Sequence, residues 1–138
     1  MKNNINEFIQ KNLKVTYPAE EYSSMKDVLT RSRLPHIVCE DGFSMSVQVG
    51  YSLYSTPKKV AKRYTAVEIG YPSEHEPLIE EYAESFCEDK IDYTDTVYPY
   101  VPVKLVNKVL KRHGGINLKE TLHGNWRIPK IRKTFLSM

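Results

Sequence analysis

Apolar and polar side chains alternate from residue 43 to residue 53, and this pattern restricts the fold of the 138-residue chain more than any other feature. The apolar positions are Phe43, Met45, Val47, Val49, Tyr51 and Leu53. A period of two residues predicts a β-strand with one buried face, because successive side chains of a strand point to opposite sides. One buried face and one polar face are typical of an antiparallel sheet covered on one side.

Three further segments have features of strands. Residues 36–39 and 64–71 are rich in β-forming side chains, and Gly42 predicts a tight turn between the first of them and the long strand. Residues 92–101 are rich in tyrosine. Within them Pro99 predicts an edge strand or a loop, because proline has no N–H to donate to a central strand.

Helical spacing of apolar residues predicts four helices. The first covers about residues 3–13, and a second, short helix begins after Ser24 as its N-cap. A third follows Ser73 and Glu76, which have the spacing of a capping box. The fourth begins at Pro102 and ends at the glycine pair 114–115, where glycine is the preferred residue after a helix.

Together these elements predict an α+β fold, with an antiparallel sheet of three or more strands and helices packed on one face. The length suits one domain. Within it we expect an N-terminal helical segment over residues 1–35, an α+β core over residues 36–116 and a basic C-terminal tail over residues 117–138. The predicted core consists of Phe43, Met45, Val47, Val49, Val67, Ile69, Leu105, Val106, Val109 and Leu110.

Catalytic and cofactor-binding motifs are not found in the sequence. It contains no glycine-rich phosphate loop, and its histidines and cysteines lack the CxxC or HExxH spacing of zinc sites. Cys39 could form a nucleophilic pair with a histidine, but cysteines in strands are usually small buried hydrophobic residues. We therefore predict that the protein is not an enzyme and uses no cofactor and no metal.

The sequence also predicts where the protein resides. It contains no apolar run of about 20 residues, and its first residues lack the apolar core of a signal peptide. Cys39 and Cys87 are too few for a small secreted scaffold, so we expect them to be reduced. These features predict a cytoplasmic protein that does not contact membranes.

Charge is strongly polarised along the chain. Residues 74–101 carry nine carboxylates and one lysine, whereas residues 102–138 carry nine cations and one carboxylate. The two segments could face each other within the fold or across a dimer, or the basic segment could bind an external polyanion. The candidate residues for binding a partner or a nucleic acid are Lys104, Lys108, Lys111, Arg112, Trp126, Arg127, Lys130, Arg132 and Lys133. Ten tyrosines are the other excess, and any group of them left exposed would favour a protein interface.

Four stretches together resemble a family of small, uncharacterised proteins of bacteriophages and mobile elements. They are DGFSMSVQ from Asp41, YTAVEIGYPS from Tyr64, TVYPYVPV from Thr96 and HGGI from His113. The resemblance covers about residues 36–116 and implies no catalytic residue. It implies an accessory protein that binds and modulates a host or defence-system protein, and this is our first hypothesis for the function. The alternative is a nucleic-acid-binding protein that uses the basic C-terminal helix and tail.

Overall fold

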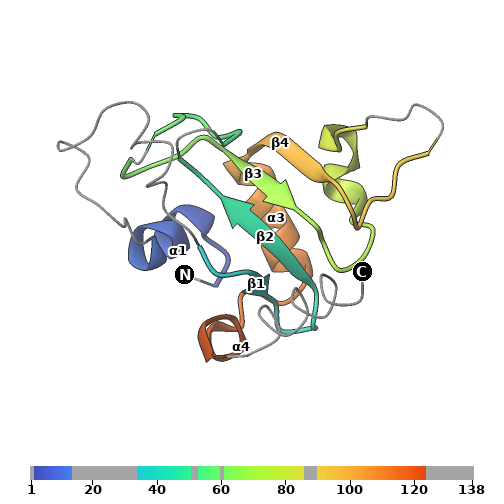
Figure 1. Ribbon diagram of the computed structural model, residues 1–138. Helices are drawn as coiled ribbons and strands as arrows, with labels where there is room; N and C mark the ends of the chain where they lie inside the picture. Colours follow the sequence, from blue (N-terminus) through green and yellow to red (C-terminus); the bar gives the residue numbers. More distant parts are fainter. Residues whose placement is uncertain (1, 14–33, 51–52, 60, 86–89, 124–138) are drawn as a thin grey trace, which may run out of the picture.

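The computed structural model describes residues 2–13, 34–50, 53–59, 61–85 and 90–123. Its centre is a four-stranded antiparallel sheet in the order β1-β2-β3-β4 (Figure 1). The strands are β1 (Ile37–Val38), β2 (Ser44–Gln48), β3 (Ala66–Gly70) and β4 (Val97–Pro102). The helices are α1 (Ile5–Asn12), the 3-10 helix η2 (Pro77–Tyr82), α3 (Val103–Arg112) and α4 (Leu118–His123). The predicted α+β fold with an antiparallel sheet is confirmed.

One face of the sheet packs on α3, which passes behind the strands in Figure 1. The buried side chains of β2 and β3 alternate with partly exposed ones, as the period of two predicts. Every residue of the predicted core is buried except Leu105, which is partly buried against it. The N-terminal helix adds Ile5, Phe8 and Ile9 to the same core.

The long strand predicted over residues 43–53 is wrong beyond Gln48. Gly50 adopts a φ of 121°, which a side chain rarely allows, and the N–H of Leu53 donates to the Gly50 carbonyl at 3.2 Å. The N–H of Gly50 donates to the buried Ser55 hydroxyl oxygen at 3.1 Å. The strand therefore ends in a turn although the apolar pattern continues.

The helix predicted after Ser73 also differs from the structure. The Ser73 hydroxyl oxygen accepts from the N–H of Ser44 at 2.9 Å, so it ties this loop to β2 and caps no helix. Glu76 is the N-cap instead, and it is followed by a single short 3-10 helix. The second predicted helix, after Ser24, lies outside the described residues.

The edge strand β4 agrees with the prediction from Pro99. At the opposite edge, α4 packs against β1: the N–H of Val38 donates to the Thr121 hydroxyl oxygen at 2.9 Å, and its carbonyl accepts from the N–H of Asn117 at 2.8 Å. The beginning of the segment predicted as a basic tail thus contains a helix that covers the sheet edge.

Candidate functional site

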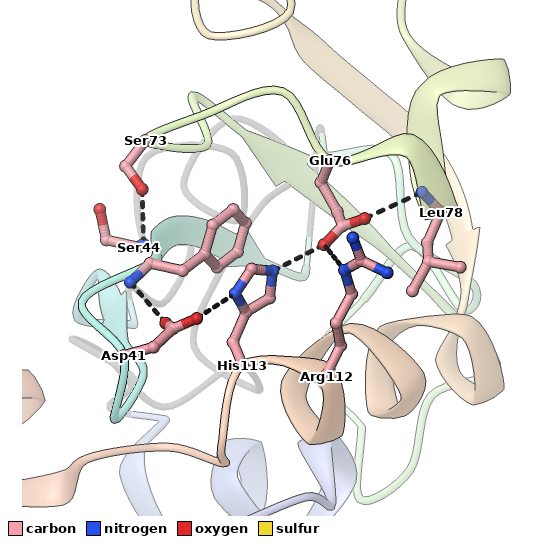
Figure 2. A network of polar contacts seen from close by, with 8 residues as sticks. Asp41, Ser44, Ser73, Glu76, Leu78, Arg112 and His113 are labelled. Carbon is pink, nitrogen blue, oxygen red and sulfur yellow. Dashed lines mark hydrogen bonds and ion pairs between the residues drawn. The ribbon is translucent and has the colours of Figure 1, made fainter.

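A histidine between two carboxylates joins three parts of the fold (Figure 2). His113 is the C-cap of α3, where Gly114 and Gly115 end the helix with φ values of 88° and 90°. Asp41 lies in the turn between β1 and β2, and Glu76 is the N-cap of η2. The three side chains therefore come from segments that are far apart in the sequence.

Short contacts hold this group together. Nδ1 of His113 lies 2.7 Å from Oδ2 of Asp41, and its Nε2 lies 2.6 Å from Oε1 of Glu76. Nε of Arg112 lies 3.4 Å from the same Glu76 oxygen. The ring of Phe43 stacks on the imidazole with centroids 4.0 Å apart. We call Asp41, Glu76, Arg112 and His113 the histidine network.

Glu76 is the most buried carboxylate of the histidine network, with 1% of its surface exposed. Its second oxygen, Oε2, accepts from the N–H of Leu78 at 3.0 Å and so caps η2. Both oxygens are therefore engaged, one by cations and one by backbone. A buried carboxylate is tolerated because each of its oxygens has a partner.

Opposing influences set the pKa values in the histidine network. Burial acts to lower the pKa of His113, but hydrogen bonds to Asp41 and Glu76, together with their charges, outweigh it and raise that pKa. Burial acts to raise the pKa of Asp41, but the N–H of Phe43 and the hydrogen bond to His113 lower it overall. A protonated imidazole donates from both nitrogens, which suits two carboxylate partners.

The histidine network does not have the arrangement of a nucleophile-activating triad. In a nucleophile-activating triad one imidazole nitrogen faces a carboxylate and the other faces the nucleophile. Here both nitrogens of His113 face carboxylates, so neither is left for a nucleophile. Within the described ranges no group of three or more His, Cys, Asp or Glu side chains is arranged to hold a metal ion. The network acts as a tie between the end of α3, the β1–β2 turn and the start of η2.

The basic candidates of the sequence fall into three sets. Lys104, Lys108 and Lys111 are exposed on α3 and form no ion pair with another described residue. Arg112 is exposed but reaches Glu76, so its charge is partly compensated inside the protein. The candidates outside the described residues are Trp126, Arg127, Lys130, Arg132 and Lys133.

Cys39, the candidate nucleophile, is a buried free thiol. Burial raises its pKa to about 12, and the charges of Asp41 and Glu40 act in the same direction. Because the thiolate is the reactive form of cysteine, this environment disfavours nucleophilic chemistry.

Two exposed tyrosines lie close together, Tyr54 in the connector between β2 and β3 and Tyr100 in β4. The rings of Tyr54 and Tyr100 have centroids 5.7 Å apart, and the two residues are 37% and 41% exposed. The ammonium group of Lys58 lies 5.4 Å from the centroid of the Tyr54 ring. We call Tyr54 and Tyr100 the tyrosine pair; the sequence alone could not show which of the ten tyrosines would be exposed together.

Comparisons of the chain with protein-family models, with curated proteins and with solved structures find no match. In the part of the chain that the structure describes, no helix has the length and apolar character needed to cross a membrane.

Proposed function

We propose that this protein is a non-catalytic nucleic-acid-binding protein that uses the exposed side of α3 and the described part of the connector before β3, residues 54–59 and 61–65. One backbone contact carries the proposal: the N–H of Val103 donates to the carbonyl of Thr65 at 2.9 Å. The end of the connector and the beginning of α3 are therefore neighbours. Two basic segments that are distant in the sequence approach each other in the fold.

The lysines of α3 point away from the core. At about 100° per residue, Lys104, Lys108 and Lys111 lie within one stripe of the helix. The buried residues Val106 and Leu110 lie on the opposite stripe. Positive charge on the outer side of a helix is available to a polyanion.

The connector adds four exposed cations and contains no carboxylate. They are Lys58, Lys59, Lys62 and Arg63. Phosphate groups bind such side chains with release of counterions, which gives affinity without sequence specificity. The predicted residues Arg127, Lys130, Arg132 and Lys133 would add to this positive charge if they lie on the same side.

Replacing Lys104, Lys108 and Lys111 together by alanine is expected to weaken nucleic-acid binding. Each lysine that contacts a phosphate should contribute about 1 to the slope of log affinity against log salt concentration, so the variant should show a flatter slope. Anisotropy titrations of labelled DNA at about 50 mM and about 200 mM salt measure this.

Lys119→Ala is the matched control, because Lys119 is an exposed helical lysine on α4, which packs at the other edge of the sheet. It should leave affinity and slope close to those of the unaltered protein. Equal losses in the control and the triple variant would contradict a site on α3, and no binding of any DNA at low salt would overturn the proposed function.

The second candidate function is binding of a host or defence-system protein, as expected of a phage or mobile-element accessory protein. The exposed tyrosine pair favours it, because tyrosine is enriched where protein interfaces concentrate their binding energy. Affinity capture from nuclease-treated bacterial extract tests this candidate. A protein retained by the unaltered chain and lost from Tyr54→Ala and Tyr100→Ala variants would support it.

A further inference from the structure

We infer that the tyrosine pair is a stacking site for the bases of single-stranded nucleic acid, with the cations of the connector contacting the adjoining phosphates. This inference rests on the proposed function and names the class of nucleic acid. It assigns a role to Tyr54 and Tyr100, which lie outside α3 and the C-terminal tail.

The tyrosine pair is held in place by its backbone. The N–H of Tyr100 donates to the carbonyl of Tyr54 at 3.1 Å, and the N–H of Tyr54 donates to Oε1 of Glu68 at 3.0 Å. Tyr100 has a φ of 53°, a conformation that non-glycine residues adopt rarely. Positions with such strain are often found where function requires a fixed side chain. The rings are therefore presented on ordered backbone before any ligand arrives.

The rings already contact each other, so a base would stack on an outer face and not between them. Centroids 5.7 Å apart with planes tilted by 52° match ordinary tilted aromatic contacts. Every base has a π-face, and stacking on exposed aromatic rings is the main sequence-tolerant contact to single strands. In a duplex the bases are already stacked on each other, so exposed tyrosines gain nothing from it.

The connector that carries the cations is anchored to the fold. The Tyr64 hydroxyl donates to the carbonyl of Lys59 at 2.8 Å and accepts from the N–H of Ala61 at 2.8 Å. Asn6 of α1 binds both the N–H and the carbonyl of Tyr64. Because the backbone is held at Lys59, Ala61 and Tyr64, binding a ligand here requires little ordering of these residues.

Single-stranded nucleic acid fits this surface better than a protein does. Lysine is depleted at protein interfaces, whereas Lys58 lies directly beside the tyrosine pair. An added β-strand finds few free groups on β4: the carbonyl of Val97 accepts from Glu84 at 2.9 Å, Pro99 has no N–H, and the N–H of Tyr100 is engaged.

Fluorescence anisotropy with a labelled oligothymidylate of about 16 nucleotides and the matching duplex tests the inference. The unaltered protein should bind the single strand more tightly than the duplex. Tyr54→Ala and Tyr100→Ala should each weaken single-strand binding by about 5- to 150-fold, which corresponds to the loss of one stacked base. Duplex binding should not change.

Two controls make the result specific. Tyr54→Phe keeps the ring and should keep single-strand affinity. Tyr71→Ala removes another exposed tyrosine with a positive φ of 50°, so it matches Tyr100→Ala in both exposure and backbone strain. It should not change single-strand affinity.

The outcomes separate the inference from the proposed function. If DNA binds but the tyrosine variants retain full affinity while the α3 lysine variant loses it, the stacking site is overturned and the proposed function stands. If neither the single strand nor the duplex binds at low salt, the stacking site and the proposed function are both overturned. A protein partner then becomes the better account of the tyrosine pair.

Discussion

Glu76→Ala is expected to destabilise the folded protein by about 3–5 kcal/mol, the cost typical of removing one partner from a buried ion pair. The substitution leaves the imidazole of His113 without the carboxylate that accepts from Nε2, and it removes the acceptor for the N–H of Leu78. Glu76 is almost fully buried, so water cannot replace these contacts. Urea unfolding followed by circular dichroism measures the loss.

The chain provides a matched control for this prediction inside η2, the 3-10 helix that Glu76 caps. Glu80 lies 2.6 Å from Nε2 of His75, the same distance as Glu76 from His113, but its side chain is 44% exposed. Glu80→Ala should therefore cost about 1 kcal/mol or less. Similar losses in the two variants would show that burial does not govern the contribution of Glu76.

A milder substitution serves if Glu76→Ala does not fold. Glu76→Gln keeps the side-chain volume and an oxygen for the N–H of Leu78, but it places a neutral amide beside His113 and Arg112. We expect a smaller loss than for alanine, because no cavity is created and the cap is retained.

The fold could be predicted from the sequence where the pattern is local. The alternation from Phe43 to Val49 fixes which side of β2 is buried, and the stripe of α3 fixes which side of that helix packs on it. The end of β2 could not be predicted in the same way, because Tyr51 and Leu53 continue the apolar period. The positive φ of Gly50 and its hydrogen bond to the Ser55 hydroxyl end the strand, and neither feature produces a periodic pattern in the sequence.

The histidine network could not be predicted because its contacts are not local. His113 is 72 residues from Asp41 and 37 from Glu76. In the sequence Glu76 is one of nine carboxylates of an acidic segment, and the capping-box spacing from Ser73 assigns it to an exposed first turn. Only the fold shows that this carboxylate is buried and faces the end of the basic helix.

The same contacts bear on the charge asymmetry. Glu76 of the acidic segment meets Arg112 and His113 of the basic segment, so the two segments do face each other at one place. Lys104, Lys108 and Lys111 show no ion pair within the described ranges. Ion pairing within the protein therefore accounts for the positive charge at the end of α3, whereas Lys104, Lys108 and Lys111 remain available to an external partner.

Stability should fall as pH rises above about 6.5, the ordinary pKa of histidine, and His113 should be responsible. Its pKa is raised in the folded protein, so folding favours its protonated form. The stabilisation is fully present below the ordinary pKa and is lost as pH rises through the higher pKa of the folded state. The carboxylates that raise it are Asp41 from the β1–β2 turn and Glu76 from the start of η2, and Arg112 of α3 shares the Glu76 carboxylate.

Asp41 governs how the stability of the protein depends on pH in the acid range. Its pKa is lowered in the folded protein, so its contribution is present above the ordinary aspartate pKa of about 3.9 and is lost as pH falls through the lower folded value. Between these two limits Asp41 and His113 are both charged, and their contribution to stability should be constant.

His113→Gln separates this effect from the titration of other groups. The free energy of unfolding of the unaltered protein should decline from about pH 6.5 upward, whereas that of the variant should be lower near neutral pH and should lack this decline. The difference between the two curves isolates His113, because both proteins share His36, His75 and His123.

An NMR titration of the unaltered protein provides a measurement that does not depend on the variant: the imidazole resonances of His113 should titrate above the ordinary histidine pKa. If they titrate below it, the two carboxylates do not outweigh burial, and stability should then increase with pH through that range because the neutral imidazole is the form that folding favours.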